Sequence, residues 1–544
     1  MSTPPDSPTP STPSAASTTV TTHPILGVFG VLLGAMIATC TGQLLSVGLA
    51  DLRGALHLGV DQASWMGTAF NAPMMFIGPL SVYLGSVFGV RRVLLTCGIV
   101  FTMTSVLLPF AASFAILLAL LVLAGLTAGT FYPLTLSIVL RNLPVKYALL
   151  GFAMYAMDIV FTTNVATPLE AWYMDHLSWR WIFWNSAALT PIMIVLIYFG
   201  IPRQPLPKPK EGQPKPSWRG FLYVSLGFTL LFMALNQGQR LNWLHSAKII
   251  ALVVTGLFLL LAAVLHHFTL RAPLVDLKFL MRRNTVLLGL VVFLFHITMM
   301  ATLVLLPSYL GNVKGYLPLQ TGRVMLWVGL PQFVFGLLAM YLLRYIDARL
   351  ILTAGFTLVA IACLMNAQLS SAWSGTNFGP SQAVMAVGLA LAFNAVVGAI
   401  ILEIVNSGKL SRPIDTLTFA GFFQTVRLFG GQIGTAFMLH FLSVREQFHS
   451  NILGLGVHLG DTATRQRLFL LSGAMAPHST GTNMAIGRAL EILDLQVRRQ
   501  AFTLAITDSF KLVAWSAACC LIVIACMARV PKQYRQLLAA SKPD

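Results

Sequence analysis

Long apolar runs recur along almost the whole chain and are separated by short polar segments. Most of these runs could cross a hydrocarbon layer about 30 Å thick at a helical rise of about 1.5 Å per residue. Backbone N–H and C=O groups find no water inside lipid, so runs of this length predict helices rather than strands. The pattern predicts fourteen membrane-spanning helices, at 24–45, 64–85, 92–110, 113–140, 147–173, 179–201, 219–236, 247–267, 285–310, 320–343, 349–369, 380–406, 415–442 and 508–529.

The composition of the chain points to the same class of protein. Of its 544 residues, 56% are hydrophobic and 10% are charged, whereas roughly a quarter of the residues in a soluble chain are charged. We therefore predict an all-α polytopic membrane protein. The formal net charge of +18 does not indicate nucleic-acid binding, because the basic residues fall in short clusters between apolar runs.

The distribution of Lys and Arg orients the chain. Segments after the odd-numbered spans carry few of them, apart from 443–507, and segments that long translocate largely regardless of charge. Because basic loops stay in the cytoplasm, both termini are predicted to be cytoplasmic. The basic clusters follow even-numbered spans, at 91–92, 141–146, 208–219, 278–283, 344–349 and 409–412.

Two similar basic turns indicate a weak internal repeat. GSVFGVRRVLL (85–95) follows the second span and RYIDARLILTAG (344–355) follows the tenth. They occupy the same place in a six-helix unit if the seventh and eighth spans are an inserted pair. Two related bundles facing each other across a pathway are typical of transporters.

These features predict the organisation of the chain. The first segment is rich in Ser, Thr and Pro, which is typical of disorder. The predicted parts are a disordered cytoplasmic tail (1–23), an N-terminal six-helix bundle (24–201), a cytoplasmic linker (202–218), an inserted helix pair (219–267), a C-terminal six-helix bundle (268–529) with a long periplasmic loop (443–507), and a cytoplasmic tail (530–544).

Six short stretches carry a resemblance to a known family. They are DHLSWRWIFWN (175–185), NQGQRLNWLHS (236–246), PLVDLKFLMRRN (273–284), LPSYLGNVKGYLPLQTG (306–322), QTVRLFGGQIGTA (424–436) and RQAFTLAITDSF (499–510). In this order and spacing, the chain resembles the fourteen-span drug:proton antiporter branch of the major facilitator superfamily, the EmrB/QacA type. The resemblance runs from about Gly27 to Ala528.

The resemblance implies a fold, a function and partners. The fold is the major facilitator fold, and the function is proton-coupled export of amphipathic organic compounds by alternating access, in the inner (plasma) membrane of a bacterium. In relatives from double-membraned bacteria, the side that carries 443–507 meets a periplasmic membrane-fusion adaptor and, through it, an outer-membrane channel. Residues 482–506 have apolar positions at mixed three and four spacing, which predicts an amphipathic helix in that segment.

Several residues that the family usually associates with coupling are replaced in this chain. Thr41 stands where an acid is usual in the first helix, Ser86 where an Asp is usual, and Leu121 where an Arg is usual. The glycine-rich stretch of the fifth helix is reduced to TPLEA (167–171). Coupling therefore uses other groups or is absent. Two alternatives stay open: a facilitator or importer of organic anions without that coupling, and a non-transporting scaffold.

Three ionisable residues lie near the middle of predicted spans. Asp158 is about eleven residues, or roughly 16 Å, from the inner face, with His296 at a similar depth and Arg427 in the thirteenth span. A charge at mid-depth costs about 2.5–3.5 kcal/mol on insertion scales, so such groups should face a cavity or one another. We predict proton coupling by Asp158 and His296, and a substrate or switch role for Arg427. A static ion pair or helix packing is the alternative.

Other polar residues are weaker candidates. Glu170 and Glu403, near the ends of their spans, are predicted as substrate or switch contacts, with helix-terminal solvation as the alternative. Helix-to-helix bonding is the alternative for the predicted cavity-lining set, which is Phe161, Thr162, Asn164, Asn71, Asn394 and Gln424.

Nothing in the sequence indicates an enzyme. A phosphate loop of the Walker form is absent, and no His, Cys and carboxylate cluster has metal-ligand spacing. We therefore predict no cofactor and no metal. The expected partners are a small organic substrate, the proton and the lipid bilayer.

Overall fold

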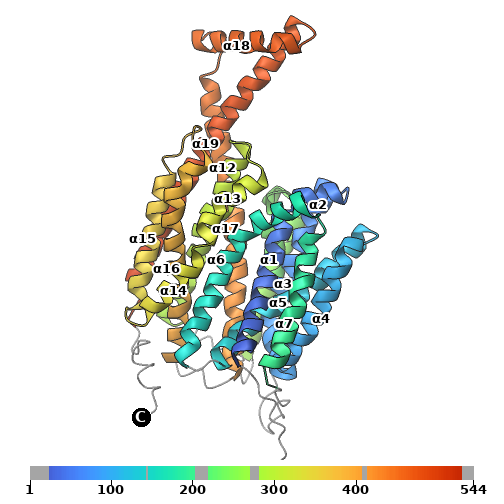
Figure 1. Cartoon of the computed structure of the whole chain (residues 1–544), viewed down its shortest axis with the longest axis vertical. Helices are drawn as coiled ribbons and strands as arrows, with labels where there is room; N and C mark the ends of the chain where they lie inside the picture. Colours follow the sequence, from blue (N-terminus) through green and yellow to red (C-terminus); the bar gives the residue numbers. More distant parts are fainter. Residues whose placement is uncertain (1–23, 143–144, 203–217, 270–280, 407–412, 530–544) are drawn as a thin grey trace, which may run out of the picture.

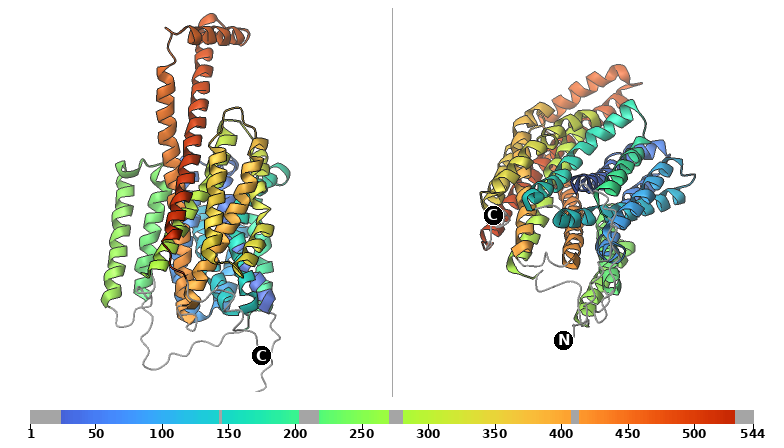
Figure 2. Two further views of the ribbon diagram at one scale, coloured as in Figure 1. Left: turned by 90° about the vertical axis from the view of Figure 1, so that its left-hand side faces the viewer. Right: turned by 60° about the horizontal axis from the view of Figure 1, so that its bottom comes forward.

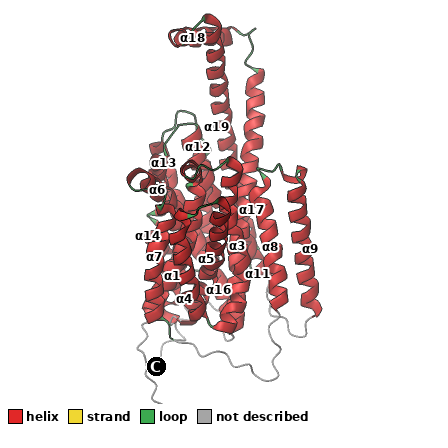
Figure 3. Cartoon of the chain, turned by 90° about the vertical axis from the view of Figure 1, so that its right-hand side faces the viewer, coloured by secondary structure: helices red, strands yellow, loops and turns green. Residues whose placement is uncertain are grey.

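The computed structural model describes residues 24–142, 145–202, 218–269, 281–406 and 413–529. The predicted tails (1–23 and 530–544) and most of the predicted linker lie outside these residues. Within them the regular secondary structure is helical (Figure 3). This confirms the predicted all-α class.

Each predicted span falls on one helix or on two consecutive helices. The short elements include α2 (Leu49–Ala55) and α12 (Leu306–Asn312). The long helices are α1 (Pro24–Val47), α3 (Val60–Phe88), α4 (Val90–Leu107), α5 (Phe114–Asn142), α6 (Val145–His176), α7 (Trp181–Gly200), α8 (Trp218–Gly238), α9 (Ala247–Thr269), α11 (Arg283–Met300), α13 (Pro318–Gly329), α14 (Gln332–Leu343), α15 (Ala348–Asn366), α16 (Gly379–Asn406), α17 (Pro413–Leu455), α18 (Thr462–Met475) and α19 (Thr482–Ala525).

Two predicted spans are interrupted. The span predicted at 285–310 contains a π-helical turn at Ala301–Leu305 between α11 and α12. The span predicted at 320–343 breaks between α13 and α14, where Pro331 has no backbone N–H to continue the helical hydrogen bonds. The hydrophobic pattern predicts neither the π-helical turn nor the break, because it reflects contact with lipid and does not depend on whether the helix is continuous.

The segment 443–507 differs from the predicted loop. Helix α17 continues to Leu455, α18 crosses over, and α19 returns without interruption from Thr482 (Figure 1). The predicted amphipathic helix at 482–506 is therefore the first part of α19. Charged residues end the apolar run at 442 but not the helix, since a helix that leaves lipid tolerates charge. We call 443–507 the hairpin, the end of the bundle that carries it the hairpin end, and the opposite end the terminal end.

Two seams join the halves of the chain. Helix α6 packs on α13 and α14, and α3 packs on α17. The predicted inserted pair lies at the side: α8 packs on α3 and α17, while α9 packs mainly on α8 (Figures 2 and 3). Eleven helical segments among the described residues are long and apolar enough to span a membrane. The predicted spans that fall short are α3, α6 and α17, which are the helices at the seams.

The internal repeat has a structural counterpart. At the start of α4, Arg91 donates from Nη2 to the Tyr198 carbonyl oxygen near the end of α7, at 2.8 Å. At the start of α15, Arg349 donates from Nη1 to the Met527 carbonyl oxygen just after α19, at 2.9 Å. The third helix of each six-helix unit is thus tied to the sixth by an arginine in an equivalent place.

The two turns differ in their acidic groups. Asp347 caps α15 by accepting from the Arg349 backbone N–H at 3.1 Å, and its other oxygen lies 3.2 Å from the Arg349 guanidinium. In the first turn, Ser86 stands where the resemblance expects an acid, and its hydroxyl donates to the Tyr83 carbonyl at 2.8 Å. The complete acid–arginine arrangement therefore belongs to the second turn.

Glycines set the closest helix contacts. A Cβ on Gly125 of α5 would lie 2.1 Å from the Phe70 carbonyl oxygen of α3, and one on Gly129 would lie 2.7 Å from the Met74 carbonyl oxygen. Without a hydrophobic driving force between helices in lipid, such backbone approach is a main source of packing energy.

We expect Gly125→Ala to destabilise the protein by about 1–3 kcal/mol, because the added methyl group meets backbone that cannot move aside. Thermal unfolding of the purified protein in detergent measures the effect. Gly67→Ala on α3 is the matched control, since its Cβ would meet no heavy atom within 4 Å. Equal melting temperatures for the two variants would contradict this account of the α3–α5 contact.

Candidate transport site

An aromatic and cationic cluster lies where α5, α6 and α17 meet. The Arg427 guanidinium carbon is 4.0 Å from the centre of the Tyr132 ring, and the Tyr132 and Tyr155 ring centres are 4.6 Å apart. Arg427 Nε donates to Gln424 Oε1 at 3.1 Å, while Nη2 is buried without a hydrogen-bond partner among the described residues. A desolvated guanidinium over an aromatic face gains cation–π stabilisation, which holds Arg427 at the seam.

Asp158 reaches the same region from α6, one turn after Tyr155. Its Oδ1 accepts from the Thr162 hydroxyl at 3.0 Å, and its Oδ2 is buried with no hydrogen-bond partner in the described part of the chain. Asp158 and Arg427 act on each other electrostatically but form no direct ion pair among the described residues. The sequence-predicted pair thus lies between the two halves of the chain, and each member has one side-chain atom without a hydrogen-bond partner among the described residues.

His296 faces the glycine stretch of α17. Its Nδ1 lies 2.8 Å from the Val292 carbonyl oxygen of its own helix. A Cβ on Gly430 would lie 3.7 Å from Nδ1, and one on Gly434 would lie 3.3 Å from the His296 carbonyl oxygen. This environment suits a packing residue with a satisfied ring nitrogen. Proton coupling by His296 stays a prediction.

A pocket open to solvent lies between α11, α16 and α17. Glu403 is its ionisable lining residue, and Glu403 Oε2 lies 3.4 Å from the Asn284 side-chain nitrogen. The apolar walls extend along α17 to the turn before Arg427. They include Leu288, Val292, Ile400, Phe422, Phe423 and Val426.

The predicted cavity-lining residues lie elsewhere. None of the six lines the pocket at Glu403. Phe161 packs on Phe333 of α14 with ring centres 4.6 Å apart. Asn164 and Asn394 donate to carbonyls of their own helices, at Val160 and Ala390, each at 2.8 Å.

The other predicted members hold their places by contacts within or between helices. The Asn71 amide donates to the Gly67 carbonyl at 3.0 Å, and Thr162 bonds Asp158. Gln424 faces α3, where a Cβ on Gly78 would lie 3.5 Å from its Cγ. These contacts are packing contacts within and between helices, and cavity lining by this set stays a prediction.

Two of the positions that depart from the resembled family, Thr41 and Leu121, hold no charge. The Thr41 hydroxyl donates to the Ile37 carbonyl at 2.7 Å, and Leu121 is buried in the apolar core. Helix α1 packs on α6, and Asp158 acts electrostatically on Cys40, the neighbour of Thr41. Asp158 thus supplies a carboxylate close to the part of α1 where the resemblance expects one.

Comparison with known proteins identifies the family of this chain. A family model described as Major Facilitator Superfamily matches residues 31–435. The chain belongs to the major facilitator superfamily. It is 25% identical over 435 residues to the multidrug export protein EmrB of Haemophilus influenzae, covering 78% of this chain and 82% of that protein. It is 24% identical over 491 residues to the fatty acid resistance protein FarB of Neisseria gonorrhoeae, covering 89% and 91%.

A solved structure agrees in fold. The proton:xylose symporter XylE superposes with a TM-score of 0.56 at 11% identity, covering 96% of this chain and 99% of that one. The predicted family and the predicted major facilitator fold are confirmed.

A polar network joins helix α8 of the inserted pair to both six-helix bundles. The sequence alone does not predict it. The Thr68 hydroxyl of α3 donates to Asn236 Oδ1 at 2.6 Å, and Asn236 Nδ2 donates to Gln432 Oε1 of α17 at 3.4 Å. Arg240, just after α8, forms an ion pair with Asp61. The residues from α8 lie in NQGQRLNWLHS, but the sequence does not show which helices they reach.

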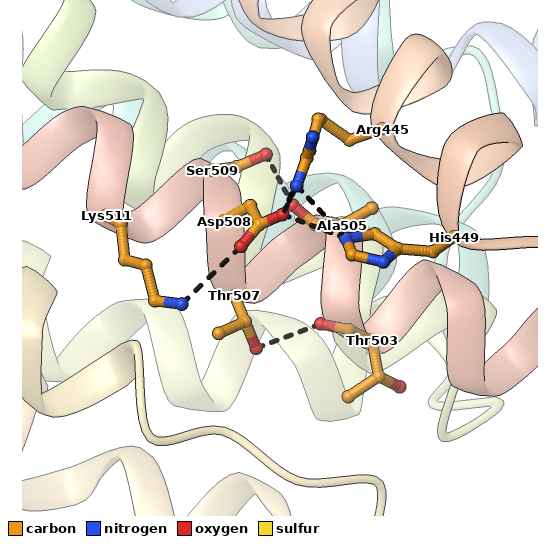
Figure 4. Close-up of polar contacts among 8 residues, drawn as sticks. All are labelled: Arg445, His449, Thr503, Ala505, Thr507, Asp508, Ser509 and Lys511. Carbon is orange, nitrogen blue, oxygen red and sulfur yellow. Dashed lines mark hydrogen bonds and ion pairs between the residues drawn. The ribbon is translucent and has the colours of Figure 1, made fainter. Parts of the chain in front are cut away.

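A charged cluster at the root of the hairpin was also missed (Figure 4). Asp508 Oδ2 of α19 accepts from Arg445 Nε of α17 at 2.9 Å and lies 2.8 Å from His449 Nε2. Lys511 Nζ is 3.5 Å from Asp508 Oδ1. The i,i+4 spacing of Arg445 and His449 places both on one face of α17, which could have indicated a shared acidic partner. That partner, Asp508, is 59 or more positions away, so the sequence does not identify it. The cluster fixes where α17 and α19 diverge.

A cap orders the next helix of the hairpin. Asp461 Oδ2 accepts from the Thr464 backbone N–H at 3.1 Å at the start of α18. That hydrogen bond, together with the Thr464 hydroxyl, holds the pKa of Asp461 below its usual value. The cap is therefore formed at neutral pH and is lost as the pH falls through that lowered pKa.

We expect Asp508→Asn to loosen the root of the hairpin, because Arg445 and His449 lose the negative charge of their shared acceptor. A loss of one to two kcal/mol corresponds to roughly 5–30-fold faster local opening. Hydrogen exchange of the amides around 445–455 in the purified protein measures it. Asp494→Asn is the control, since its ion pair with Arg498 is exposed on the same helix. Unchanged exchange in Asp508→Asn would show that the cluster does not hold the root.

Proposed function

We propose that the chain is a secondary active exporter of amphipathic organic compounds, driven by inward proton movement through alternating access. The relatives named for multidrug export and fatty acid resistance support an export role. The observation that carries the mechanism is Asp158, a carboxylate at the seam with one buried oxygen that lacks a hydrogen-bond partner among the described residues. The terminal end faces the cytoplasm of a bacterial inner membrane, and the hairpin end faces outward.

Protonation of Asp158 would change the force between the two halves. Arg427 attracts the charged carboxylate and has no such attraction to the neutral acid. Because Asp158 lies on α6 and Arg427 on α17, adding or removing the proton alters the electrostatic attraction across the seam. Proton-coupled alternating access needs a group whose protonation differs between the two states, and Asp158 supplies one.

The pocket supports a substrate class. Apolar walls with Glu403 as the ionisable lining residue favour neutral or cationic amphipathic compounds over anions. This feature separates the proposal from the alternative of an organic-anion facilitator.

The hairpin supports a periplasmic partner. Helix α18 has no buried residue, and Phe469 and Leu470 on it are exposed. A helical projection with exposed apolar side chains is suited to docking a membrane-fusion adaptor that continues to an outer-membrane channel. In this proposal, the two six-helix bundles rock while the inserted pair stays at the side.

We expect Asp158→Asn to reduce gradient-driven export by at least roughly tenfold, to the level of empty vesicles, because the side chain no longer changes charge. Flux is measured in reconstituted vesicles with an imposed pH gradient and fluorescent cationic, neutral and anionic amphipathic compounds. Asp494→Asn is the control for insertion and general stability. Undiminished export by Asp158→Asn would remove Asp158 from the mechanism, and wild-type flux that ignores a collapsed gradient would favour the facilitator.

We expect Glu403→Gln to weaken transport of cationic compounds by roughly tenfold, the equivalent of about 1.4 kcal/mol for a lost charge-assisted contact. Neutral compounds serve as the internal control, because they make no such contact. The same vesicles report both. Equal losses for cationic and neutral compounds would mean that Glu403 supports the structure and does not select the substrate.

A further inference from the structure

Glu170 is the most thoroughly enclosed acid among the described residues that the transport proposal leaves unused. It lies near the hairpin end of α6 and is 1% exposed. Neither carboxylate oxygen has a hydrogen-bond donor in the described part of the chain. A buried charge without hydrogen bonds is too costly to persist, so the group is neutralised or binds a cation.

The space around this carboxyl group is shaped for it. Gly48 lies between α1 and α2, and a Cβ there would sit 3.0 Å from Glu170 Oε1 and 2.7 Å from Ile182 Cδ1 of α7. Any larger residue at 48 would displace the carboxyl group or the isoleucine. The missing side chain therefore leaves the room that Glu170 occupies beside α2.

The charged groups that act on Glu170 in the described chain are both acidic. Asp51 of α2 lies within hydrogen-bonding reach of it, and Asp175 on α6 adds negative charge. Two carboxylates are acceptors only, so they cannot bond each other unless one of them carries a proton. Because Glu170 is buried, two negative charges side by side here would repel each other strongly, and one bound proton removes that repulsion.

We propose that Asp51 and Glu170 share one proton, as a carboxyl–carboxylate pair at the hairpin end of the pathway. Hydronium on the hairpin side transfers the proton, which forms one O–H bond and leaves water behind, and release of the proton to water forms hydronium again. The pair carries a net charge of −1 with the proton bound and −2 without it. The proton's part in transport rests on the proposed function, whereas its binding does not.

The ligand set favours a proton over a metal ion. Calcium takes six to eight oxygen ligands, and within the described ranges no group of three or more His, Cys, Asp or Glu side chains is placed to hold a metal. A bridging proton needs one oxygen from each carboxyl group. Asp51 and Glu170 meet that requirement.

The location of the pair gives it a consequence for access. Pro168, two residues before Glu170, lies at the tight contact with α13, where a Cβ on Gly322 would be 2.6 Å from its Cα. Loss of the shared proton makes Asp51 and Glu170 repel each other and pushes α2 away from α6. The pair thus couples proton binding at the hairpin end to the α6–α13 seam.

Infrared difference spectroscopy of the full-length protein in lipid nanodiscs tests the pair directly. We expect the wild type at neutral pH to show a carbonyl band of a protonated carboxylic acid that shifts in D2O. Glu170→Gln should lose one such band, and Asp175→Asn, the matched control on the same helix, should keep it. A wild-type spectrum that matches Glu170→Gln in this region would overturn the proposal. Loss of the wild-type band on adding sodium or calcium chloride would mean a metal-cation site instead.

A second variant separates sharing from simple burial and does not depend on how Glu170→Gln folds. Asp51→Asn places an amide donor beside Glu170, which stabilises its ionised form, so the band should disappear at neutral pH. A band unchanged in Asp51→Asn would mean that Glu170 holds its proton alone, against the proposal. The spectra need neither substrate nor gradient. Vesicles without export, in a protein that keeps the band, would therefore refute the exporter and leave the proton pair standing.

Discussion

The hydrogen-bonding requirement of a lipid-embedded chain governs this structure. Polar side chains in hydrocarbon must find partners inside the protein. The helices that carry such side chains at mid-depth, notably α6 and α17, are therefore drawn to the seams, where Asp158, Gln424 and Arg427 meet other protein. Helix α9, which is apolar and mostly exposed in the described chain, remains at the side. Polar side chains at mid-depth thus favour a place between other helices, and α9, which has no charged side chain there, lies at the side.

Sequence periodicity predicted the helices well because lipid imposes one simple test on every span. It also placed Asp158 and Arg427 near mid-depth, and the structure places them close enough to act on each other electrostatically. It could not rank the polar residues further. Asn164 and Asn394 look like cavity residues in sequence, yet each amide bonds a carbonyl of its own helix. Only the direction of a side chain separates those roles.

Contacts between distant helices were beyond the sequence. Asp508 and Arg445 are 63 positions apart, and nothing local in either segment indicates the other. The hairpin was predicted as a loop for a related reason. Charges at 445 and 446 indicate where the chain leaves lipid. They do not indicate where the helix ends, because α17 continues to Leu455. The internal repeat does have a counterpart in the structure. Arg91 and Arg349 each donate to a backbone carbonyl near the end of the equivalent helix, and every residue supplies such an acceptor.

The uninterrupted course of α17 through the bundle and into the hairpin has a mechanical consequence. Its 43 residues make a rod of about 65 Å at a rise of about 1.5 Å per residue. The same rod bears Arg427 at the seam and supports α18 at its far end. A tilt of about 10° about its terminal end would sweep the tip sideways by roughly 11 Å over that length. A small tilt of α17 near Arg427 would therefore produce a much larger displacement of α18, and of any molecule bound to α18.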